Sequence, residues 1–169
     1  EYPETEFADI RGNVQTRLKK LDDGIANATI FSLAGIKRMN LDITYEQIPF
    51  LLQAPSQGVV AIASLSDNDK LNERLKTISH KETEICVTIE REFLKTLEGG
   101  CTAPIGAKAE MVNGQIRFIG RLCSLDGKNC IETDEIFDWN DSENFGEKIA
   151  LKVLENGGKE LMEEIRKSL

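Results

Sequence analysis

The chain has 169 residues, 40% of them hydrophobic and 30% charged, which is the composition of a folded globular protein rather than a disordered one. Its formal net charge of −8 argues against a nucleic-acid partner, because phosphate binding needs a basic face. No apolar run reaches the length of a membrane span and no signal peptide opens the chain, so we expect no membrane partner and a cytoplasmic location. The sequence begins Glu-Tyr-Pro without a methionine, and we therefore expect a piece of a longer protein.

The first predicted element is a helix that begins after Asn13, a favourable N-cap, and ends near Gly24. Its apolar positions recur at helical spacing, at Val14, Leu18 and Leu21. Residues 29–34 then predict a buried strand, and Gly35 predicts a turn that presents cationic residues at the strand's end, as α/β sheets present ligand sites. Residues 59–64 predict a second strand, after a connector bounded by Pro49 and Pro55.

A helix follows the polar stretch 65–78. We predict that Ser79 and Glu82 form a capping box at its start. Its apolar stripe predicts burial of one face and ends at Gly99-Gly100; the stripe consists of Ile85, Ile89, Phe93 and Leu97. His80 falls inside the capping box and is given no catalytic role.

Three strands are predicted next. Residues 107–112 and 115–123 flank Asn113-Gly114, the strongest short hairpin signal, and Asp126-Gly127 precedes a strand at 130–137. We predict that Ser142 caps a helix with Phe145, Ile149 and Val153 on one face, and that Gly157-Gly158 interrupts it before residues 159–168. The fold class is thus a partial α/β domain followed by an α+β domain, whose three-stranded antiparallel sheet is packed by helices.

The four cysteines include no CxxC pair and the chain has one histidine, so no metal site is predicted. We predict that Cys86 packs in the core. A disulfide between Cys123 and Cys130 requires a register that aligns their Cβ atoms, and two ordinary thiols are the preferred interpretation.

Four stretches, in this order and spacing, resemble the porphobilinogen deaminase family (hydroxymethylbilane synthase): DIRGNVQTRL at 9–18, LAGIKR at 33–38, PSQGVV at 55–60 and LEGGCTAPIG at 97–106. The similarity runs essentially from Phe7 to the C-terminus. It implies a transferase that joins four porphobilinogen molecules head to tail with loss of ammonia and then releases the linear tetrapyrrole by hydrolysis. Its partners would be porphobilinogen and the oligopyrrole intermediates.

The resemblance also implies three domains around a cleft, of which the first two resemble periplasmic binding proteins. Residues 1–54 would be the latter part of the central domain, residues 55–78 a return segment through the first domain with a linker, and residues 79–169 the whole third domain. Most of the first domain, with its catalytic aspartate, would be missing. We therefore expect no catalytic residue in this chain, no activity by itself, and self-association through apolar surface that the missing N-terminal domain would cover.

Cys101 is the residue that the resemblance identifies as the thioether anchor of a dipyrromethane cofactor. We expect this cofactor to be absent here, because an intact active site assembles it from substrate. A covalent tether removes the entropic cost of holding the growing chain, and the preceding glycines leave the sulfur uncrowded. From spacing alone, Cys101 would be a small buried hydrophobe.

The resemblance further implies that Arg11, Arg17 and Arg38 bind the acetate and propionate groups of the pyrroles. A guanidinium matches a carboxylate bidentately, whereas three solvated surface arginines are the plain alternative. Gln57 and Gly58 would line the cleft, and Gly35 would border the ligand. The family usually has glycine where this chain has Ser56, which leaves the conformation of that loop open.

Two other functions fit parts of the pattern. A non-enzymatic small-anion binding module would bind carboxylates reversibly and need no thiol. A thiol-redox protein using Cys101 would need a nearby second cysteine or an activating histidine, and the sequence offers neither.

Overall fold

The computed structural model describes residues 4–97 and 103–168. The chain divides into two compact units, residues 1–45 and residues 46–169. The first unit contains helices α1 (Val14–Asp22) and α2 (Leu33–Arg38). The second contains the remaining elements: helices α3 (Asp69–Lys76) and α4 (Lys81–Thr96), strands β1 (Ile105–Val112), β2 (Gln115–Cys123) and β3 (Cys130–Asp138), the short helix η1 (Trp139–Asp141), and α5 (Phe145–Val153), η2 (Leu154–Gly158) and α6 (Lys159–Ser168).

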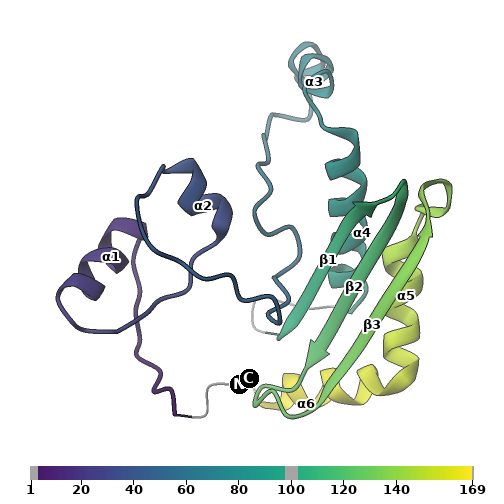
Figure 1. Cartoon of the computed structure of the whole chain (residues 1–169). Coiled ribbons are helices and arrows are strands. Elements are labelled where there is room, and N and C mark those ends of the chain that lie inside the picture. The colour runs from purple at the N-terminus through teal and green to yellow at the C-terminus, as the bar shows by residue number, and fades with distance from the viewer. Residues whose placement is uncertain (1–3, 98–102, 169) are drawn as a thin grey trace. The chain divides into compact units, whose positions relative to one another are not determined.

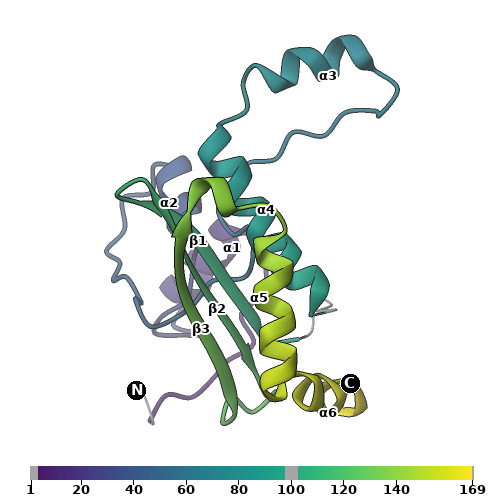
Figure 2. The same ribbon diagram turned by 90° about the vertical axis from the view of Figure 1, so that its right-hand side faces the viewer.

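The sheet of the second unit is antiparallel, with strand order β1-β2-β3 (Figure 1). The hairpin between β1 and β2 turns at Asn113-Gly114, both with positive φ, as predicted. One face of the sheet is covered by α4 and α5, and α6 packs at one end of this layer (Figure 2). On the other face, ion pairs such as Arg117–Asp134 and Arg121–Glu132 join neighbouring strands. The predicted α+β fold of this region is confirmed.

The core lies between the sheet and its helices. Phe93 of α4 and Phe118 of β2 are both fully buried, with ring centroids 5.1 Å apart in an edge-to-face arrangement. Gly120 allows this approach, since a Cβ there would lie 2.7 Å from Cζ of Phe93. The predicted stripe on α4 is confirmed by the burial of Ile89, Phe93 and Leu97. Cys86 is buried as predicted, and Trp139 packs against the core.

Both strands predicted before residue 80 are wrong in this structure. Residues 29–32 are irregular and lead into α2, because the Ser32 side chain accepts a hydrogen bond from the Gly35 amide and caps a helix. Gly35 is therefore inside a helix rather than in a turn. Residues 59–64 are irregular and exposed. A strand needs a neighbour for its backbone groups, and the described residues supply none to either segment.

Two predicted helix caps are displaced. His80, and not Ser79, is the N-cap of α4, and its Nδ1 accepts from the Thr83 amide, while Ser79 Oγ donates to Glu84. The N-cap of α5 is Asn144 in place of Ser142. Asn144 has a φ of +53°, a conformation that asparagine tolerates better than most residues.

The prediction of two thiols at the end of the β2–β3 hairpin is wrong, because Cys123 and Cys130 form a disulfide. The two residues are direct partners in the antiparallel register, with Cα atoms 4.1 Å apart. This is the alignment of Cβ atoms that the bond requires.

Candidate functional site

Arg17 is held at the start of α1 by backbone groups of its own unit. Asn13 caps the helix, with its Oδ1 accepting from the Thr16 amide at 2.9 Å. The Arg17 Nε donates to the Gly12 carbonyl at 3.0 Å, and Nη1 donates to the Ile30 carbonyl at 3.5 Å. The guanidinium carbon lies 6.0 Å from the ring centroid of Phe31, within the range of a cation–π contact. These contacts orient the guanidinium group while leaving it half-buried.

Arg11 lies at the same end of α1 and is exposed. Its Nε pairs with Asp9 Oδ1 at 3.0 Å, and its carbonyl accepts from Lys20 Nζ at 3.1 Å. Two arginines and a lysine thus gather around the helix N-terminus, where the backbone dipole also favours anions. Arg38 is the exposed last residue of α2. The structure places Arg11 just before α1, Arg17 inside α1 and Arg38 at the end of α2, all in the first unit.

Gln57 and Gly58 lie in a turn at residues 55–58 of the second unit. Gln57 is exposed, and its amide donates to the Ala54 carbonyl at 3.1 Å. Ser56 has a φ of +64° and Gly58 a φ of +84°, in the left-handed region that glycine adopts without strain. The turn therefore has the backbone of a glycine-rich loop, although a serine occupies one of its positions.

Glu90 is a functional candidate that the sequence reasoning missed. It is 3% exposed, the one charged residue in the described core. Its Oε2 accepts from the Ser56 amide at 2.6 Å, and its Oε1 accepts from the Ala109 amide at 2.8 Å. Burial raises the pKa of this carboxyl group, while the two amide bonds and nearby Lys108 oppose that rise. The sequence spacing could have predicted its burial, because Glu90 lies four residues after Cys86 and three before Phe93, on the buried face of the helix.

A hollow of about 230 Å³ opens beside this turn. Gln57 and Glu90 line it, together with Cys86 of the same helix. Burial, followed by the neighbouring Glu90, raises the pKa of the Cys86 thiol, which keeps it protonated and unreactive. Gln57, a predicted site residue, and Glu90, which the sequence reasoning missed, therefore line the same hollow.

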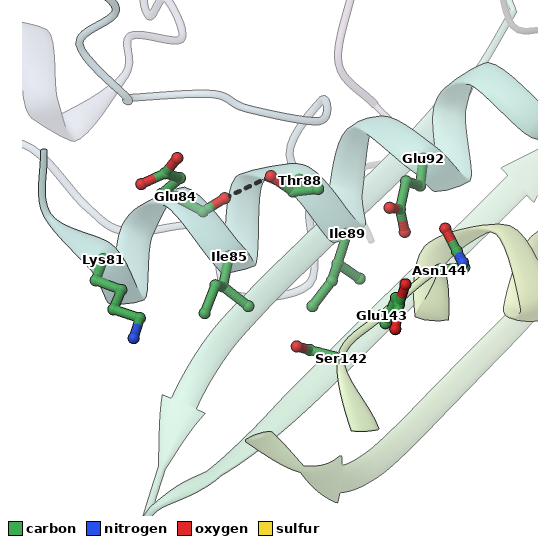
Figure 3. Close-up of a pocket in the computed structure, with 9 residues that line it drawn as sticks. All are labelled: Lys81, Glu84, Ile85, Thr88, Ile89, Glu92, Ser142, Glu143 and Asn144. Carbon is green, nitrogen blue, oxygen red and sulfur yellow. Dashed lines mark hydrogen bonds between the residues drawn. The ribbon is translucent and has the colours of Figure 1, made fainter. Parts of the chain in front are cut away.

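A larger hollow of about 410 Å³ lies between α4 and the segment that enters α5 (Figure 3). It contains none of the predicted site residues. Its lining includes three carboxylates, those of Glu84, Glu92 and Glu143. Glu92 Oε2 accepts from the Gly146 amide at 3.1 Å, so this carboxylate anchors the start of α5. An acidic hollow of this kind does not suit a carboxylate-bearing ligand.

Cys101 lies outside the described residues. The nearest described residues on either side contact the core: Leu97, the C-cap of α4, is buried, and the Pro104 carbonyl accepts from the Cys123 amide at 3.0 Å just before β1 begins. Among residues 4–97 and 103–168, no helix is long and apolar enough to cross a membrane. Within the same residues, no three acidic, cysteine or histidine side chains are grouped to hold a metal ion.

Comparison with protein families gives two matches from one family. The model described as "Porphobilinogen deaminase, dipyromethane cofactor binding domain" matches residues 1–73. The model described as "Porphobilinogen deaminase, C-terminal domain" matches residues 84–155. The first match contains all three arginines together with Gly35, Gln57 and Gly58, and the second contains Cys101.

Curated relatives agree with these matches. A porphobilinogen deaminase of Prochlorococcus marinus (strain AS9601) is 39% identical over 98% of this chain and 54% of its own length. Those of Campylobacter jejuni (serotype O:2) and Synechococcus sp. (strain CC9311) are 38% and 36% identical, over 95% and 97% of this chain and 53% of their own lengths. The chain therefore spans about half the length of the curated relatives it matches. On these grounds, the chain belongs to the porphobilinogen deaminase family.

Proposed function

We propose that this chain is the C-terminal portion of a transferase that condenses four porphobilinogen molecules into hydroxymethylbilane with release of ammonia. The observation that carries the proposal is that two domain models of one family match consecutive parts of the chain. The three arginines fall in the match to the cofactor-binding domain, and Cys101 falls in the match to the C-terminal domain. The relatives' names supply the activity.

In this proposal, Cys101 holds a dipyrromethane cofactor through a thioether bond, and the cofactor supplies the growing end to which each pyrrole is added. Its carboxylates would suit the guanidinium groups of Arg11 and Arg17, because charge-assisted bonds to arginine are the strong ones. Arg11 and Arg17 would bind these groups, with each charged hydrogen bond contributing about 1.5–3 kcal/mol. Arg38, Gln57, Gly58 and Gly35 would complete the lining of the cleft.

We further propose that the domains divide at residues 1–54, 55–78 and 79–169, and that the first part belongs to a periplasmic-binding-protein-like α/β domain. Several apolar side chains support the absence of neighbouring strands, because they are exposed in segments where the sequence pattern predicts buried strands. They include Ile30 at 63%, Val60 at 68% and Ile62 at 61% exposure. The other half of the relatives' length would provide the neighbouring strands and the catalytic aspartate.

An activity assay tests the proposal. The longer protein that contains this sequence is expected to consume porphobilinogen and release ammonia, and Cys101→Ser is expected to abolish both. The 169-residue chain alone is expected to show neither activity. Turnover by the Cys101→Ser variant, or by the chain alone, would contradict the proposal.

A titration separates this function from that of a reversible anion-binding module. Binding of a pyrrole dicarboxylate to the longer protein is measured for Arg11→Ala and Cys101→Ala. A module without a thiol requirement would lose affinity only in the arginine variant. The proposed enzyme would lose affinity in both variants, because Cys101→Ala would carry no thioether-linked cofactor to receive the pyrrole.

A further inference from the structure

Glu90 sits in the middle of α4 with both carboxylate oxygens occupied by backbone amides from other segments. Ser56 contributes one amide, at 2.6 Å, and Ala109 of β1 the other, at 2.8 Å. An isolated buried carboxylate is costly, so these two bonds are what makes a charged residue tolerable at 3% exposure. One side chain thereby joins the helix to the turn at residues 55–58 and to the edge of the sheet.

The connector before that turn is itself attached to β1. The Ala107 amide donates to the Gln53 carbonyl at 3.0 Å, and Arg121 Nη1 donates to the Phe50 carbonyl at 3.4 Å. Leu52 packs on Gly106, where a Cβ would lie 2.9 Å from Leu52 Cγ. The amides of Ala107 and Ala109 on the outer edge of β1 are therefore both satisfied, which protects an edge strand from pairing with another chain. These contacts fix residues 50–53, but they stop before the turn.

Glu90 reaches the turn itself, next to Gln57 and Gly58. We propose that Glu90 is a positioning residue whose carboxylate locks the turn at residues 55–58 onto α4, so that Gln57 and Gly58 move as one body with the helix that leads to Cys101. The importance of Gln57 and Gly58 for the ligand rests on the proposed function. The lock itself does not, since it is made of contacts within one unit.

The geometry requires a carboxylate. Two N–H donors approach from different sides, and only a carboxylate offers an acceptor to each. Glutamine would turn an NH₂ group toward one donor. The Ala109 amide belongs to a strand that β2 holds in place, whereas Ser56 belongs to a turn, so the glutamine oxygen would stay with Ala109 and Ser56 would be released.

Residue-resolved hydrogen exchange on the 169-residue chain tests the lock. In Glu90→Gln, the Ser56 amide is expected to exchange at least tenfold faster than in the unaltered chain, while the β2 amides keep their protection. Glu92→Gln is the matched control, because Glu92 is on the same helix and accepts from the Gly146 amide. That variant is expected to leave exchange unchanged at both Gly146 and Ser56, because the one oxygen of glutamine suffices for the single Gly146 bond. Unchanged exchange at Ser56 in Glu90→Gln, or equal acceleration in both variants, would overturn the proposal.

A second measurement needs no variant and so does not depend on whether Glu90→Gln folds. In the isotope-labelled unaltered chain, NMR couplings across hydrogen bonds are expected between the Glu90 carboxyl carbon and the amide nitrogens of Ser56 and Ala109. A folded chain with a coupling to Ala109 but none to Ser56 would overturn the lock. Neither experiment uses porphobilinogen, so failure of the lock and failure of the proposed function give different results.

Discussion

The regions before and after residue 80 differ in whether the strands and helices that should pack against them lie within the described part of this chain. From α4 onward, the apolar stripe of the helix and the alternation of the strands meet inside this chain, and the core closes around Phe93 and Phe118. Before residue 80, the segments 29–34 and 59–64 have the apolar composition of strands, but the described residues offer no strand beside them. A periodic pattern therefore predicts an element reliably only where its neighbours are also present.

The largest expected effect contrasts a core residue of the second unit with an apolar residue of the first. Phe93→Ala should lower the free energy of unfolding by about 3–5 kcal/mol, because a fully buried ring leaves a cavity. Ile30→Ala, at a side chain 63% exposed, should change it by less than about 0.5 kcal/mol. Urea unfolding followed by circular dichroism measures both, because the fluorescence of Trp139, the only tryptophan, reports on the second unit alone. Similar losses in the two variants would break the contrast.

Glycine substitutions sharpen the same contrast. In Gly146→Ala, the new Cβ would overlap the Ile89 carbonyl oxygen, so α4 and α5 must separate, at a cost of about 2–3 kcal/mol. In Gly35→Ala of α2, the added methyl approaches only Ser32 Oγ, at 3.1 Å, and the change should stay below about 1 kcal/mol. Thermal melts of the two variants give the comparison. A Gly146→Ala chain as stable as the unaltered one would show that the helices do not cross so closely.

Reduction of the disulfide tests the one feature of the sheet that was wrongly predicted. The bond closes a loop of sequence separation 7, so its loss should cost about 2 kcal/mol. The melting temperature should fall when a phosphine reductant is added, and the Cys123→Ser variant should not respond. Equal melting temperatures with and without reductant, in a chain whose mass shows the bond intact beforehand, would contradict this expectation.

Ser56→Gly should stabilise the chain by about 1 kcal/mol, because glycine adopts the positive φ of this turn without steric cost. The Ser56 hydroxyl oxygen is also buried, with no hydrogen-bond partner among the described residues. Ser56→Ala is the matched variant, because it removes the hydroxyl but keeps the strain. If both variants raise the urea midpoint equally, the hydroxyl rather than the backbone would be the cause.

The smallest expected effect is a pH dependence in the β2–β3 turn. Hydrogen bonds from the Ser124 hydroxyl and the Lys128 amide lower the pKa of Asp126 to about 2 from its ordinary value of 3.8. A lowered folded-state pKa means that this stabilisation is present above the unfolded-state value and is lost as pH falls through about 2. An NMR titration of the carboxyl carbon measures the midpoint, and an ordinary midpoint would refute the shift. Asp126→Asn should remove this part of the acid sensitivity.

Most of the C-terminal fold was predictable from local signals. The Asn113-Gly114 turn, the α4 stripe and the break at Gly157 all depend on residues near one another in sequence. The disulfide was not predictable, because it depends on register, and a shift of one residue would have separated the two sulfur atoms. Glu90 was not singled out from the sequence, although its helical phase places it among buried residues.

The candidate site was predictable only in part. The arginines and the Gln57-Gly58 turn follow from the family resemblance, and the place of Arg11 and Arg17 at one helix start follows from the Asn13 cap. The position of Arg38 depended on residues 29–34 forming a strand, and the helix that starts at Leu33 changes it. The anchor of the Ser56 turn depends on a contact across 34 residues of sequence, which no local pattern reveals.

The central claim is that the sulfur of Cys101 is the covalent anchor of the cofactor. Peptide mass measurement on the longer, active protein tests it most directly. We expect the peptide containing Cys101 to carry the mass of a dipyrromethane, and the Cys101→Ser variant to lack it. An active protein whose Cys101 peptide has its unmodified mass would contradict the account.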